Sequence, residues 1–336
     1  MKKATAKRVV ATAIAFLPLS LLATQSSGAA SQTVNVVGYS IVANAYTALE
    51  KAFVKTGPGQ GVTFTNSFGA STTQAEDVVA GQPADVVNFS QQPDLALLIN
   101  AGLVSRKWAT TKYSKAEKGI VTDSVVAIVV RPGNPLGIHT WNDLLNSGVK
   151  LVTPDPISSG SARWNLLAAY EAQIDQGQTA AQATTYINAL IGNVVSEPAS
   201  GSKALSAFIA GTGNVLLAYE SDALNAFATG QKLQVIEPPQ NLLIQNPAAL
   251  TSTGASNPAA KAFYAFIFSK AGQQVWLSLH FRPTLASLAS VSKSTFYTPT
   301  SFNNVTKLGG WAQVTPKFFG PTGIITKAEN AHGFTS

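Results

Sequence analysis

The segment 153–170, TPDPISSGSARWNLLAAY, combines residues that could bind an anion. Prolines end a strand, and Ser158, Ser159, Gly160 and Ser161 then lead into a helix. The first backbone N–H groups of a helix lack partners inside it and carry partial positive charge, so they can donate to an oxyanion. Gly160 also lets the backbone approach a ligand closely. An ordinary serine N-cap without any ligand explains the same residues equally well.

Two further segments have the same order of strand, small residues and helix. Residues 69–72 stand before a helix in the segment 68–81, and residues 199–202 enter a helix in the segment 196–208. Each of these alone is more simply explained as an N-cap. Three such starts in separate strand–helix units exceed what capping requires, and we expect them to converge on one cleft.

The residues that would indicate catalysis do not form a site in the sequence. Cysteine is absent, which excludes a thiol nucleophile, a cysteine-bound zinc and a lipid anchor on a signal-site cysteine. His139, His280 and His332 have no metal-ligand spacing, and Asp123 and Asp155 have no evident acid–base partner. We therefore expect no enzymatic activity, no cofactor and no bound metal. A secreted enzyme acting on sulfate or phosphate esters is the alternative.

Strand and helix patterns alternate along the chain and place these helix starts after strands. Apolar runs predict strands at 34–39, 62–67, 84–89, 124–133, 149–156 and 233–239. Amphipathic or capped runs predict helices at 43–55, 71–80, 93–102, 140–145, 161–174 and 257–279, the last broken near Gly272. This alternation favours an α/β fold in which mainly parallel sheets are flanked by helices. A length of 336 residues favours two domains.

The first thirty residues have the pattern of a secretory signal peptide. Four basic residues begin it, an apolar run from Val9 to Ala23 follows, and small residues at 28–30 offer a cleavage site. We expect residues 1–30 to be removed near Ala30–Ser31. The formal net charge of +7 then falls to +3, and no basic stripe occurs, so nucleic acid is not an expected partner. The sequence predicts a periplasmic protein that is not a lipoprotein.

The segment 158–170, SSGSARWNLLAAY, closely resembles the signature of the periplasmic sulfate-binding proteins of ABC transporters. Further segments fall in the family's order at 69–87, 129–144, 214–223, 281–284 and 309–311, so the resemblance extends over most of the chain. It implies a two-lobed periplasmic binding protein fold, type II-like, whose lobes close on a dehydrated anion.

Carried over onto this sequence, the resemblance implies a binding site made of backbone N–H groups and hydroxyls. It assigns ligand contacts to Ser71 at the first helix start, to Ser159, Gly160 and Ser161 at the second, and to Ala199 at the third. Ser161 replaces a glycine of the family, but its backbone N–H survives that change.

Two positions depart from the family's pattern. Tyr219 stands where several members have a tryptophan whose indole N–H binds the anion, and a phenol hydroxyl could replace that donor. Gly38-Tyr39-Ser40 stands where members have S-Y-D, so Ser40 replaces an acidic residue beside the ligand. We keep Tyr219 and Ser40 as ligand-binding candidates. Arg163 is expected to support the helix start through an ion pair or hydrogen bonds instead of touching the anion.

The resemblance implies a monomeric protein that captures sulfate for an ABC importer and delivers it to the permease subunits with their ATPase. Sulfate has no proton to donate at neutral pH, which suits a site of donors alone. Thiosulfate, molybdate, tungstate or phosphate is the alternative ligand. We expect a first lobe of residues 31–122 and about 228–285, a second lobe of 123–227, and a C-terminal segment, 286–336, packing across both.

Overall fold

Two sheets organise the described part of the chain, which in this computed structural model is Met1 and residues 32–334. The expected signal peptide therefore lies outside the described residues, except for Met1. In spatial order the first sheet contains β11 (Arg282–Pro283), β4 (Ile120–Ser124), β10 (Gln240–Leu250), β3 (Val86–Asn88), β1 (Thr33–Tyr39) and β2 (Thr63–Gly69), and β12 (Ser301–Asn304) pairs with β10. The second contains β7 (Val194–Ser196), β6 (Leu151–Val152), β8 (Val215–Tyr219), β5 (Val126–Val130) and β9 (Gln234–Ile236).

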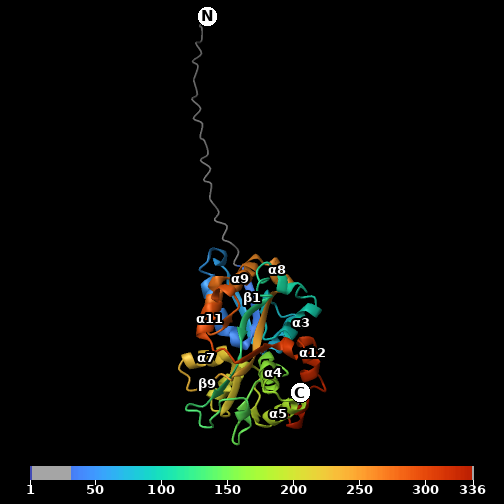
Figure 1. Cartoon of the computed structure of the whole chain (residues 1–336). Helices are drawn as coiled ribbons and strands as arrows, with labels where there is room; N and C mark the ends of the chain where they lie inside the picture. The colour runs from blue at the N-terminus through green and yellow to red at the C-terminus, as the bar shows by residue number, and fades with distance from the viewer. Residues whose placement is uncertain (2–31, 335–336) are drawn as a thin grey trace. The chain divides into compact units, whose positions relative to one another are not determined.

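Helices accompany both sheets (Figure 1). Those from the segments of the first sheet are α1 (Ala43–Phe53), α2 (Ser71–Val79), α3 (Gln92–Asn100), α8 (Ser252–Ser256), α9 (Pro258–Phe268), α10 (Lys270–Ser278) and α11 (Ala289–Thr295). Those from the segments of the second are α4 (Gly160–Asp175), α5 (Ala180–Gly192), α6 (Gly201–Ile209) and α7 (Glu220–Ala228). The C-terminal segment adds α12 (Trp311–Val314) and α13 (Ile324–Ala331). The predicted two-lobed α/β fold is thus the observed one.

The helix that contains the main sequence motif, α4, is packed against neighbouring elements on several sides. Nearly every side chain along it is buried, because it packs against β10 as well as α5 and β8. Trp164, 1% exposed, donates its indole N–H to the Ser90 carbonyl (2.9 Å) and meets the ring of Trp311 edge-on. A helix fixed on several sides gives its first turn a fixed position, which a binding site needs.

The prediction of a single strand at 124–133 is wrong in detail, because the chain passes from the first sheet to the second within this valine-rich run. β4 pairs with β10 in the first sheet, whereas β5 pairs with β8 and β9 in the second. Val125 is the crossing residue between them. The return crossing lies between β9 and β10, because β9 still pairs with β5. We therefore propose that the second lobe runs from Val126 to Ile236, beyond the limit of about 228 expected from the sequence.

Both sheets are mixed, whereas the sequence predicts mainly parallel ones. The βα units pair in parallel, as β1 does with β2 and β3, and β6 with β7 and β8. β10 and β11 in the first sheet and β5 in the second run the other way, so they make antiparallel pairs with β3, β4, β8 and β9. Among the described residues no helix is both long and apolar enough to cross a bilayer.

The C-terminal segment contacts elements from both sheets. β12 pairs in parallel with β10 of the first sheet, and α13 packs against α5 beside the second. These contacts support the expected packing of residues 286–336 across the lobes, which we retain as a proposal together with the lobe limits.

Candidate anion-binding site

Three helices begin next to one another with buried backbone donors in their first turns. α2 begins at Ser71, α4 at Gly160 and α6 at Gly201, and the residue before each is extended. Such a turn leaves the first N–H groups without partners inside the helix. Within residues 32–334, no hydrogen bond engages the N–H groups of Ser71, Gly160, Ser161 or Gly201. These donors are available to an anion.

Hydrogen bonds between distant segments bring these helix starts together. The Thr72 N–H donates to the Ser158 carbonyl (3.0 Å) and joins α2 to the loop before α4. The Ser202 N–H donates to Ser40 Oγ (3.3 Å) and joins α6 to the short 3-10 helix that follows β1. The start of α2 therefore meets that of α4, the start of α6 meets the residues after β1, and each of these two bonds joins one lobe to the other.

Side chains pack so closely around the start of α4 that position 160 has no room for a residue larger than glycine. Ser159 and Ser161 are 2% and 4% exposed, and their hydroxyl oxygens lie 2.8 Å apart. A Cβ added to Gly160 would lie 2.8 Å from the Cβ of Ser90, and one added to Gly201 would lie 2.8 Å from Ile41 Cδ1 of the first lobe and 3.0 Å from Ser161 Oγ. Glycine at these two positions therefore allows the backbones of the two lobes to approach.

Tyr219 ends β8 with its side chain fully buried. Its hydroxyl lies 2.7 Å from Ser90 Oγ, and the Ser90 N–H in turn donates to Ser71 Oγ (2.9 Å). Burial raises the pKa of Tyr219, so the hydroxyl keeps its proton. A hydroxyl can donate one hydrogen bond and also accept, so Tyr219 has capacity for one more partner beside Ser90.

A buried carboxylate, Asp94 on α3, orders the start of α2. It accepts hydrogen bonds from Ser71 Oγ (2.6 Å), Thr72 Oγ1 (2.9 Å) and Gln91 Nε2 (3.0 Å). Burial raises the pKa of Asp94, and the hydrogen bond from Ser71 lowers it. Because the Ser71 hydroxyl donates to this carboxylate, its backbone N–H is the donor left for an anion.

Arg163 makes its contacts away from these donors. Its Nε donates to the Pro156 carbonyl (2.8 Å), and its guanidinium carbon lies 5.1 Å from the ring centre of Phe319. These contacts tie the loop before α4 to the C-terminal segment.

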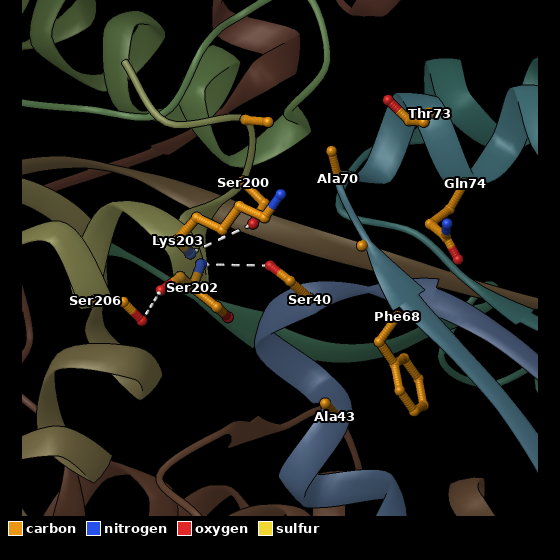
Figure 2. Close-up of a pocket in the computed structure, with 12 residues that line it drawn as sticks. Ser40, Ala43, Phe68, Ala70, Thr73, Gln74, Ser200, Ser202, Lys203 and Ser206 are labelled. Atoms are coloured by element: carbon orange, nitrogen blue, oxygen red, sulfur yellow. Dashed lines mark hydrogen bonds between the residues drawn. The ribbon is translucent and has the colours of Figure 1, made fainter. Parts of the chain in front are cut away.

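An open cleft of about 520 Å³ lies between the starts of α2 and α6 (Figure 2). Of the residues predicted from the sequence, Ser40 and Ala199 line it, whereas those at the start of α4 do not. Ala199 is exposed, and its carbonyl accepts a hydrogen bond from Ser158 Oγ (2.9 Å). Residues at two of the three helix starts therefore form the walls of this cleft.

The sequence did not reveal Ser90 and Asp94 as part of this arrangement. Ser90 contacts three of the predicted residues, and its carbonyl accepts from Trp164 and from Asn246 Nδ2 (2.9 Å). One signal could have found it, because Ser90 follows the predicted strand 84–89 and ligands of α/β sheets bind at the carboxyl ends of strands. Asp94 had no such signal.

Comparisons with known proteins agree with this architecture. Residues 34–282 match the family model of the bacterial extracellular solute-binding proteins. The chain is 35% identical to the sulfate-binding protein of Synechococcus elongatus, over 91% of this chain and 89% of that one. It is 29% identical to the thiosulfate-binding protein of Escherichia coli, over 83% and 84% of the two chains.

A solved structure is also similar over nearly its whole length. The sulfate-binding protein SubI from Mycobacterium tuberculosis is 38% identical, with a TM-score of 0.81, and the match covers 86% of this chain and 99% of that one. The family match spans both sheets from β1 to β11. The chain therefore belongs to the bacterial extracellular solute-binding proteins.

Proposed function

We propose that this protein is the substrate-binding component of an ABC importer and that its ligand is sulfate. The observation that carries this proposal is the set of buried, unengaged backbone N–H groups at three converging helix starts. Relatives named for sulfate binding match the chain over most of its length.

The proposed contacts are backbone donors first and hydroxyls second. Ser71, Gly160 and Ser161 supply N–H groups, and Ala199 supplies another in the cleft. The hydroxyl of Tyr219 has the capacity for one further bond. The hydroxyls of Ser40 and Ser159 complete the proposed set, and Arg163 supports the loop before α4.

The same arrangement favours sulfate over phosphate. Phosphate usually carries a proton at neutral pH, which needs an acceptor in the site. The carboxylate of Asp94 contacts the start of α2, but it already accepts hydrogen bonds from three donors. Buried sites can discriminate between two ligands by factors of ~10⁴ when one of the complexes leaves a polar group unpaired.

The family and its transport role imply a location and a partner. We propose export through a signal peptide at residues 1–30, a periplasmic location without a lipid anchor, and a monomer that delivers its ligand to the permease subunits. We propose that the protein binds its ligand without catalysis, because the relatives are named as binding proteins.

Thiosulfate is the second candidate, because one relative is named for it. Thiosulfate is a tetrahedral dianion like sulfate, but a larger sulfur atom replaces one of the oxygen atoms. Calorimetric titration of ligand-free protein with sulfate, thiosulfate, molybdate and phosphate separates these candidates. We expect the tightest binding for sulfate and none for phosphate. Tighter binding of another anion would replace sulfate in the proposal, and no binding of any of them would refute it.

A further inference from the structure

The cleft contains a lysine whose position the fold does not explain. Lys203 is exposed in the first turn of α6, and it is the only residue with an ionisable side chain among those lining the cleft in the described structure. A cation near a helix N-terminus is opposed by the helix dipole. Within residues 32–334 the side chain of Lys203 makes no ion pair that would offset this cost.

The side chain of Lys203 extends into the cleft. Figure 2 shows Lys203 reaching past Ser200 in the direction of Ala70, at the start of α2 on the opposite wall. Its own N–H donates to the Ser200 hydroxyl (3.4 Å), which fixes the base of the side chain. An anion that enters between α2 and α6 therefore passes this ammonium group.

We propose that Lys203 is the capture residue of the cleft, a cation that attracts the anionic ligand and speeds its entry. The inference rests on the proposed function. The helix starts attract only at short range, because the dipole effect falls off within the first turn. A full charge acts over about 10 Å at 0.1 M ionic strength and concentrates a counter-ion in a cleft.

This role differs from holding the bound ligand. Lys203 is exposed, so water and salt screen it, whereas the donors at the start of α4 are buried. Charges of this kind change the association rate more than the dissociation rate. The dissociation constant should therefore change by the same factor as the association rate.

Stopped-flow measurement of sulfate binding by tryptophan fluorescence tests this role. Lys203→Gln should lower the association rate by ~3- to 10-fold at low ionic strength, and the difference should vanish in 0.5 M sodium chloride. Lys203→Arg should restore the wild-type rate. Lys232→Gln is the matched control, because Lys232 is an exposed lysine of the same lobe that does not line the cleft.

Three results would overturn the inference while leaving the proposed function intact. Equal association rates for Lys203→Gln and Lys232→Gln would show that position does not matter. A difference that persists in 0.5 M salt would exclude long-range attraction. A change confined to dissociation would make Lys203 a contact of the bound anion. Failure of the wild-type protein to bind sulfate in calorimetry would instead refute the proposed function.

Discussion

Gly160→Ala should weaken sulfate binding without harming the fold. An added Cβ would lie 2.8 Å from Ser90 Cβ, 2.9 Å from Ser90 Oγ and 3.0 Å from Gln91 Cγ. Carbon atoms prefer separations of about 3.5–4.0 Å, so the two chains must part by roughly 0.7 Å or more. Ser90 cannot easily give way, because its N–H, its carbonyl and its hydroxyl are all hydrogen-bonded.

The loss of binding free energy in Gly160→Ala follows from the position of the contact between residue 160 and Ser90. Gly160 starts a helix of the second lobe and Ser90 follows a strand of the first, so the clash opposes closure of the lobes. Overpacking of this size costs about 1–3 kcal/mol, which corresponds to a rise of about 5- to 150-fold in the dissociation constant. Gly201→Ala should cost less, because its nearest neighbour is the flexible end of Ile41 at 2.8 Å.

Calorimetry with sulfate and thermal unfolding of the ligand-free protein separate binding from stability. Gly160→Ala should keep or raise the melting temperature without ligand, since alanine is the better helix former. Gly57→Ala is the control, because a Cβ there would meet nothing within 4 Å. Wild-type affinity in the Gly160 variant would refute the argument, because the close contact would then not belong to the bound state.

Three further substitutions test other parts of the structure. Arg163→Ala should lower stability by about 1–2 kcal/mol in urea unfolding and leave sulfate affinity nearly unchanged; loss of binding in a folded variant would contradict this. Glu220→Gln should cost about 3 kcal/mol in the same assay, because it leaves Arg282, 8% exposed and 2.6 Å away, without its partner. Burial, together with the charge of Glu329, raises the pKa of Glu197. The protonated Glu197 therefore contributes its full stabilisation below the ordinary carboxyl range, and this contribution is lost as the pH rises above that range. Glu329→Gln should flatten that fall in melting temperature between pH 5 and 9, and an unchanged slope would exclude the pair as its cause.

Local patterns in the sequence predicted the helix starts well, because a helix start is a local event. Extended residues, then glycine or serine, then a helical pattern are sufficient to place unpaired N–H groups at Ser71, Gly160 and Gly201. That these starts meet is a property of the topology, and the only local hint of it was that the same kind of start occurs in three separate strand–helix units. Periodicity alone left a plain N-cap as an equal explanation for the segment around Ser159.

What the sequence did not predict depends on long-range pairing. β10 was not recognised as a strand, although it is the longest strand among the described residues, because Asn241, Asn246 and Pro247 interrupt its apolar pattern. Asn246 is nevertheless fully buried, where it accepts from Tyr39 (3.0 Å) and donates to the Ser90 carbonyl. A polar residue inside a strand is satisfied only by partners that the fold brings to it.

The two proposals assign charge and dipoles to different tasks. A dehydrated dianion held by fixed N–H groups needs no formal charge in the buried site, and a buried cation would itself have to be desolvated. Such a site attracts a distant anion only weakly, because helix dipoles act at short range. Lys203 in the cleft supplies attraction where water already solvates the ammonium group, so it incurs no burial cost. Selection by buried donors and capture by an exposed charge are therefore compatible, and each can be altered without the other.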